Sequence, residues 1–92
     1  MDNAATRVRE VRINLFGGFR QFHDAPAISL EIEPAATVAT LRRRIAELFD
    51  EDVKARDLLK ASAFATDQRV LGEDDRIPAD QDLALLPPVC GG

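Results

Sequence analysis

Apolar and polar side chains alternate in two short stretches near the start of the chain. In the first stretch the apolar residues lie two positions apart, at Val11, Ile13 and Leu15. In the second, residues 28–33, isoleucine and leucine alternate with serine and glutamate. This period is typical of strands buried on one face. The pattern predicts two antiparallel strands joined by a loop, with a turn at the glycine pair 17–18.

The apolar spacing changes to three and four residues after Pro34. One helical stripe then contains Val38, Leu41, Ile45, Leu48 and Phe49. Thr37 is the expected N-cap, because its hydroxyl can accept a hydrogen bond from a free N–H of the first turn. The acidic run 50–52 fits poorly at a helix C-terminus, so the helix should end near Phe49. The arginines at 42–44 are expected on a solvated face.

The second half of the chain has shorter signals. Three apolar residues, Val53, Leu58 and Leu59, predict a short helical turn over the core. Residues 63–66 predict a strand, with a turn at 67–68 and an antiparallel mate at 69–71. The polar segment 72–82 reads as a loop, and residues 83–86 as the last strand. Two prolines follow, and pairing should stop there because proline cannot donate to a sheet.

These elements predict one α+β domain of two layers, with one main helix packed across a mixed sheet of four to five strands. We expect a flexible lead at 1–7, the domain at 8–86 and an extended C-terminal tail at 87–92. The order of elements suits the β-grasp fold, and other small α+β topologies fit the same pattern.

Composition narrows the possible functions. The chain has 92 residues and a net charge of −4, which disfavours a nucleic-acid binder because such proteins need a basic face. One cysteine and one histidine exclude an internal disulfide and a Cys- or His-rich metal site. No apolar run has the length of a membrane span. A polar N-terminus without a signal-peptide pattern favours the cytoplasm.

The domain at 8–86 contains few candidate catalytic or ligand-binding residues. His23 has no obvious nucleophile to serve. The acidic runs 50–52 and 73–75 lack the spaced ligands and central glycine of a calcium loop. The glycine pair 17–18 lacks the spacing of a phosphate-binding loop. We therefore expect no catalytic residue and no bound metal or cofactor in this chain.

The end of the chain carries the strongest chemical signal. Its last residues are Pro87, Pro88, Val89, Cys90, Gly91 and Gly92. Two glycines have no Cβ, so the backbone there can thread a narrow channel. What such a tail delivers is its terminal carboxylate, which becomes an acyl donor once ATP-dependent adenylation has given it a leaving group.

The C-terminal segment LLPPVCGG at 85–92 resembles the terminal signature of the ubiquitin-like sulfur carriers, the ThiS/MoaD family. Within that family it is most similar to the small, sulfur carrier subunit of molybdopterin synthase. The similarity extends to RINLFG at 12–17, to the helix start at 37–41 and to the polar turns at 66–68 and 79–82. Only the terminal motif is highly specific.

The resemblance implies a ubiquitin-like β-grasp fold and a function without catalysis by the chain itself. An E1-like adenylating enzyme would use ATP to activate Gly92, and a persulfide sulfur would then replace AMP to leave a thiocarboxylate. In molybdopterin (molybdenum cofactor) biosynthesis, the large synthase subunit would receive that sulfur. The free carrier would be a monomer, and Pro87 to Gly91 would thread into the partner enzymes.

The resemblance also implies a partner-docking patch of Phe16, Val70 and Leu86. The strand pattern supports exposure, because Phe16 and Leu86 fall out of phase with the inward-facing residues. The alternative is that all three residues belong to the core. Cys90 departs from the family, where smaller residues are commoner at this position. It is either a tolerated small residue or a thiol placed near the activated carbonyl of Gly92.

Three other functions stay open. Carriers for thiamin, for cysteine or thio-metabolites and for tRNA thiolation share the terminal glycines. A ubiquitin-like protein modifier would instead join its C-terminus to lysines of other proteins. This chain has only Lys54 and Lys60, so it offers few sites for building chains of itself. A plain interaction domain would not need Gly91 and Gly92 at all.

Overall fold

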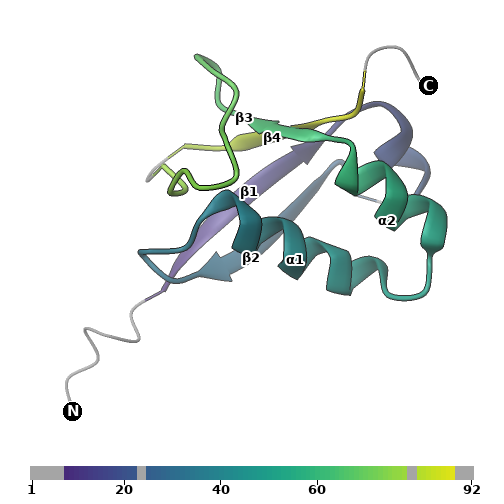
Figure 1. Cartoon of the computed structure of the whole chain (residues 1–92), viewed down its shortest axis with the longest axis horizontal. Helices are drawn as coiled ribbons and strands as arrows, with labels where there is room; N and C mark the ends of the chain where they lie inside the picture. Colours follow the sequence, from purple (N-terminus) through teal and green to yellow (C-terminus); the bar gives the residue numbers. More distant parts are fainter. Residues whose placement is uncertain (1–7, 23–24, 79–80, 89–92) are drawn as a thin grey trace.

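A computed structural model describes residues 8–22, 25–78 and 81–88 of the chain. Its elements in chain order are β1 (Arg9–Leu15), the 3-10 helix η2 (Gly17–Gln21), β2 (Ala27–Ile32), α1 (Val38–Phe49), α2 (Val53–Lys60), β3 (Ala63–Ala65) and β4 (Leu83–Leu86). The helices lie together on one side of the sheet (Figure 1). The predicted lead at 1–7 and His23 lie outside the described residues.

The sheet has four strands in the order β2-β1-β4-β3. β2 pairs with β1 antiparallel, β1 with β4 parallel, and β4 with β3 antiparallel. The first and last strands of the domain are thus central neighbours. This confirms the predicted mixed sheet and the β-grasp arrangement, in which α1 crosses one face of the sheet.

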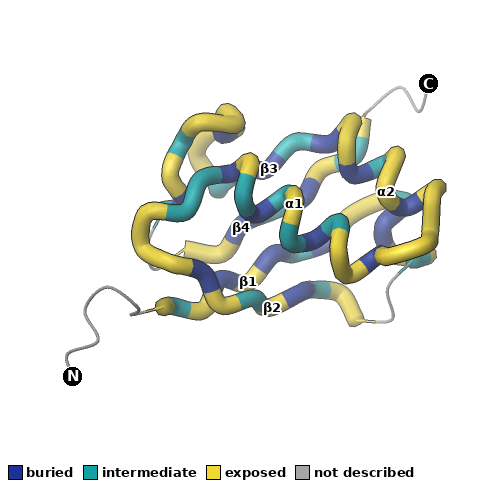
Figure 2. The backbone as a smooth tube through the Cα atoms, turned by 60° about the horizontal axis from the view of Figure 1, so that its bottom comes forward, coloured by how far each residue is buried: buried dark blue, intermediate teal, exposed yellow. Residues whose placement is uncertain are grey.

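The core lies between the sheet and the helices (Figure 2). The strand residues predicted to face inward alternate as expected, and all but one are buried: Val11, Ile13, Leu15, Ile28, Ile32, Leu83 and Leu85. The exception is Leu30 on the edge strand β2, which is half-buried and packs against this core. On the helix side of this core, α1 buries Val38, Leu41, Ile45 and Phe49. Burial of these apolar side chains is the main favourable term in folding such a domain.

Both α-helices begin at side-chain caps. Thr37 Oγ1 accepts a hydrogen bond from the Thr40 amide at 3.5 Å, which confirms the predicted N-cap of α1. Asp52 Oδ1 accepts from the Ala55 amide at 3.1 Å and caps α2. α1 ends at Phe49 as predicted, and Asp50 follows with a positive φ of 50°. The acidic run that limits α1 therefore also supplies the start of α2.

Two apolar residues expected over the core are exposed instead. Leu48 lies at the edge of the apolar stripe in the last turn of α1, where less of the protein covers it. Val53 is the first residue of α2, a helix that buries Ala55 and Leu59. At 100° per residue, Val53 lies about 200° around the helix from Ala55 and so faces away from the core. The predictions for both residues were wrong.

Two loop predictions also need correction. The glycine pair 17–18 begins a 3-10 helix, because Phe19 turns inward and stacks on Phe49 with ring centroids 6.3 Å apart. The segment 69–71 forms a single bridge, between Ala65 and Val70, in place of a strand. The chain cannot continue along β3 because it turns at once, with the Gly72 amide donating to the Asp75 carboxylate at 2.8 Å.

The arginine run on α1 is not uniformly solvated, contrary to expectation. Arg42 Nη1 donates to the backbone carbonyl oxygens of Leu59 at 2.6 Å and Ser62 at 2.8 Å. The same guanidinium pairs with Glu73 and lies 5.1 Å from the ring centroid of Phe64. Its side chain is only 19% exposed. Arg42 therefore ties α1 to the end of α2 and to the loop before β4.

Candidate functional site

The parallel pairing of β1 and β4 brings two chain segments out of the sheet at the same end. Leu15 pairs with Leu85, so the residues that follow each of them continue side by side. Pro87 and Pro88 come directly after β4 and carry no amide hydrogen, so the strand pairing stops here as predicted. This end of the sheet is where the C-terminal segment leaves the domain (Figure 1).

The tail itself is only partly described. Pro87 is half-buried and Pro88 is exposed. The predicted tail residues Val89, Cys90, Gly91 and Gly92 lie outside the described residues. Their roles in threading and in carrying sulfur stay predictions from the sequence.

The residues expected to dock a partner are exposed on the sheet. The exposed fractions are 45% for Phe16, 37% for Leu86 and 61% for Val70. The alternative that these residues belong to the core is therefore wrong. Their role in docking stays a prediction.

Strand register places all three side chains on the face of the sheet away from the helices. Leu15 and Leu85 are paired and both face the core, so Phe16 and Leu86, one position later, both face outward. Residues directly opposite one another share a face, and Ala65 pairs with Ala84 and bridges to Val70. We call the face that bears Phe16, Leu86 and Val70 the open apolar face.

Alanines separate the large side chains on this face. Ala63 pairs with Leu86, and Ala84 pairs with both Ala65 and Asn14. Because an alanine side chain is one methyl group, small side chains lie between Phe16, Leu86 and Val70, with Asn14 beside them. Exposed apolar patches rimmed by polar residues often mark interaction sites.

A groove of about 610 Å³ lies beside the base of the tail. Its walls come from η2, from α2 with its C-cap, and from the first two tail residues: Gly17, Gly18, Lys54, Asp57, Leu58, Ala61, Pro87 and Pro88. The floor is mainly apolar, with one lysine and one aspartate contributing charge. The chain therefore leaves β4 along a wall that α2 and η2 build together.

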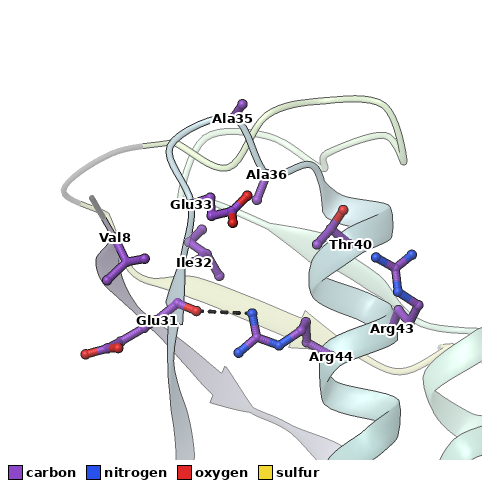
Figure 3. Close-up of a pocket in the computed structure, with 9 residues that line it drawn as sticks. All are labelled: Val8, Glu31, Ile32, Glu33, Ala35, Ala36, Thr40, Arg43 and Arg44. Carbon is purple, nitrogen blue, oxygen red and sulfur yellow. Dashed lines mark hydrogen bonds between the residues drawn. The ribbon is translucent and has the colours of Figure 1, made fainter. Parts of the chain in front are cut away.

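A second pocket, of about 560 Å³, lies at the opposite end of the sheet, between the end of β2 and the first half of α1 (Figure 3). There Arg44 Nη1 donates to the carbonyl oxygen of Glu31 at 3.2 Å. Arg43 and Glu33 also line this pocket. It is separated from Pro87 by the length of β1, because Arg9 at the start of β1 pairs with Ile32 at the end of β2.

Among residues 8–22, 25–78 and 81–88, no group of three or more His, Cys, Asp or Glu side chains could hold a metal ion. No helix in those same ranges is long and apolar enough to span a membrane. The feature that remains is the position of the tail. The sheet holds its first residue, Pro87, at one end, beside the open apolar face.

Sequence reasoning predicted the exposed residues Phe16 and Leu86 and the unpaired tail, but it missed that Gly17 lies against Pro87 and that Leu58 lines the same groove. The signal was present in part, because a glycine after β1 and a proline after β4 each suggest a special backbone position. Their proximity depends on the parallel register, which the sequence pattern does not reveal.

The chain is similar to a curated protein of related length. It is 38% identical over 81 residues to the molybdopterin synthase sulfur carrier subunit of Synechococcus elongatus. The match covers 84% of this chain and 90% of that protein. Similarity over nearly all of both chains applies to the whole domain and not to a single motif.

Solved structures share the fold at low sequence identity. The ubiquitin of Caldiarchaeum subterraneum aligns with a TM-score of 0.62 and 17% identity, covering 94% of this chain and all of that one. A complex of subunits 1 and 2 of the molybdopterin-converting factor from Helicobacter pylori contains a chain with a TM-score of 0.59 and 22% identity. That match covers 91% of this chain and 100% of the other. Both likenesses support the ubiquitin-like β-grasp fold.

The model of one protein family matches most of the chain. The description of that model is "ThiS family", and the match runs over residues 13–92, from β1 to the terminal glycines. Together with the similarity to the curated sulfur carrier subunit, the match shows that the chain belongs to the ThiS family of ubiquitin-like sulfur carriers.

Proposed function

We propose that this protein carries sulfur as a thiocarboxylate on Gly92 and donates it in molybdopterin biosynthesis. The observation that carries the proposal is the 38% identity to the sulfur carrier subunit of a molybdopterin synthase, which extends over 90% of that protein. The terminal glycine pair, Gly91 and Gly92, supplies the reacting group. The domain itself supplies no acid, base or nucleophile to the reaction.

The chemistry begins at the terminal carboxylate. A carboxylate oxygen of Gly92 attacks the α-phosphorus of ATP on an E1-like partner, and pyrophosphate leaves. The terminal sulfur of a persulfide then attacks the acyl-adenylate carbonyl, and AMP leaves. A thiol cleaves the resulting S–S bond, which leaves the thiocarboxylate on Gly92 and a disulfide on the donor side. No cofactor stays bound to the carrier in this scheme.

The folded body contributes recognition and placement. The open apolar face lies at the same end of the sheet as Pro87, so a protein that covers Phe16 and Leu86 also lies over the start of the tail. A partner's channel could then receive a tail of small residues without further ordering of the domain. The large synthase subunit is proposed as a partner by analogy with the two-subunit complex of Helicobacter pylori. The activating enzyme is proposed because the terminal carboxylate needs adenylation before it can accept sulfur.

The test is an intact-mass measurement after incubation with the E1-like enzyme encoded in the same organism, ATP and a sulfur donor. We expect a mass increase equal to the replacement of one oxygen by one sulfur. A variant that lacks Gly91 and Gly92 is the control and should gain nothing while keeping the same unfolding temperature. Sulfur loading of that shortened variant, or no loading of the full chain, contradicts the proposal.

The same preparation separates the alternatives. Transfer of the loaded sulfur to a pyranopterin acceptor by the large synthase subunit supports the molybdopterin pathway, whereas transfer only to a thiazole precursor, an amino acid or a tRNA supports another branch. Lysine conjugates of the full chain in a lysate support a protein modifier, a class that includes the ubiquitin with the same fold.

A further inference from the structure

The residue opposite the base of the tail is a glycine with little space around it. Gly17 has a positive φ of 59°, a backbone conformation that L side chains rarely adopt. A Cβ atom built on Gly17 would lie 2.7 Å from Pro87 Cγ. Contacts under 3.0 Å require something to move, and here the obstacle is a rigid ring. Gly17 and Pro87 are thus in direct contact only because residue 17 has no side chain.

Strand register explains why these two residues meet. Leu15 pairs with Leu85 in the parallel ladder, so two positions later Gly17 stands opposite Pro87. Pro87 has no N–H, so it cannot donate a further ladder bond. The strand ladder therefore fixes the direction of the chain less tightly from this point. Packing of the Pro87 ring against Gly17 is then the contact that fixes the direction of the chain.

The next tail residue, Pro88, lies beside the C-terminal end of α2. Pro88 lies along the same groove as Leu58 and Ala61 of the α2 end. Proline also fixes its own φ near −65°, so two consecutive prolines leave few directions open to the segment. A small change at residue 17 would therefore be transmitted along the tail as a change in its direction.

We propose that Gly17 is a positioning residue for the carrier function: it forms a notch that seats Pro87 and so sets the direction in which the tail leaves the domain. This inference rests on the proposed sulfur transfer. The reacting carbonyl lies five residues beyond Pro87, and a partner active site must receive it while the body of the domain is docked. Displacements of about 1 Å can lower rates by up to 10²-fold in such reactions.

The experiment is a double-mutant cycle on the full chain, with Gly17→Asn and Pro87→Ala singly and together. Asparagine adopts a positive φ more readily than most residues, so Gly17→Asn adds a side chain with less backbone strain than other substitutions, and the cycle cancels the strain that remains because both backgrounds share it. Pro87→Ala removes the Cγ atom that the new side chain would meet. Each variant receives its thiocarboxylate by chemical ligation, which makes loading independent of the activating enzyme. The measured quantity is kcat/KM for sulfur transfer with the large synthase subunit, alongside the thermal unfolding temperature.

We expect Gly17→Asn to lower kcat/KM about tenfold or more in the wild-type background and less than about threefold in the Pro87→Ala background. Gly72→Ala is the matched glycine control, since its added Cβ meets only the Asp75 carboxylate, at an ordinary 3.6 Å. An equal loss in both backgrounds, or no loss in either, overturns the inference. Sulfur transfer by the wild-type protein is measured in parallel, and its absence overturns the proposed function instead.

A second measurement covers the case in which the Gly17 variants do not fold. In the NMR spectrum of the wild-type protein, the α protons of Gly17 should show nuclear Overhauser contacts to the Pro87 ring protons. If those contacts are absent, the inference that Gly17 seats Pro87 is wrong, regardless of how the variants transfer sulfur.

Discussion

Replacing Arg42 by alanine tests whether one side chain on α1 holds the second half of the domain in place. Its guanidinium donates to the carbonyl oxygens of Leu59 and Ser62, at 2.6 and 2.8 Å, and pairs with Glu73. Alanine keeps α1 helical because it is the best helix former. The substitution therefore removes the tertiary contacts of Arg42 without a local penalty.

The magnitude follows from the partners. Hydrogen bonds to a charged group contribute about 1.5–3 kcal/mol each, and the exposed Glu73 adds about 0–1 kcal/mol. Because these two hydrogen bonds are only partly buried, water replaces part of what is lost. We expect the free energy of unfolding to fall by about 2–4 kcal/mol in total. For a domain of this size that lowers the unfolding temperature by roughly 10–25 °C.

Urea unfolding followed by circular dichroism measures this change, and Arg43→Ala provides the matched control on the same helix. Arg43 is exposed, so its removal should change the free energy by less than about 0.5 kcal/mol. Arg42→Lys should fall between the two, because an ammonium lacks the planar fork that reaches the two carbonyl oxygens and the Glu73 carboxylate at the same time. Equal stability of Arg42→Ala and Arg43→Ala would refute the reasoning.

Three further predictions concern the open apolar face, the tail and the start of the chain. Phe16→Ala should fold normally and bind the large synthase subunit at least tenfold more weakly by calorimetry, since exposed aromatics are frequent binding hot spots. Phe19→Ala is the contrasting variant in the core, and it should lower the free energy of unfolding by about 3–5 kcal/mol. Unfolding of Phe16→Ala would place that residue in the core after all. Cys90→Ser should keep full sulfur transfer by intact mass and turnover, and a large loss would give the thiol a role. A chain that starts at Val8 should have the same unfolding temperature as the full chain, and a lower one would show that residues 1–7 stabilise the domain.

Much of the fold follows from the local sequence pattern. The alternation at Val11, Ile13 and Leu15, the cap at Thr37 and the helix end at Phe49 each depend on neighbours within a few positions, and each is confirmed. The exposure of Leu48 depends instead on where other elements lie around α1. Periodicity identifies an apolar stripe but not how much of its margin is covered.

The candidate site also has features that follow from the local sequence and features that depend on contacts between distant residues. Exposure of Phe16 and Leu86 followed from the two-residue period, because a residue out of phase with the core must face outward. The contacts of Arg42 and the notch at Gly17 could not be predicted, since both join positions far apart in the chain. Each requires knowledge that β1 and β4 are parallel neighbours or that the end of α2 packs beside α1.

The central pairing of β1 with β4 has a consequence for how the domain folds. Its first and last strands must meet before the four-stranded sheet is complete, and such contacts of high sequence separation slow folding relative to a domain of local contacts. A chain cut anywhere before β4 loses one partner of β1 and, within the described part of the chain, the one strand that pairs with β3. Because the tail extends from β4 and the open apolar face needs both strands, a protein that recognises the two together discriminates against unfolded carriers.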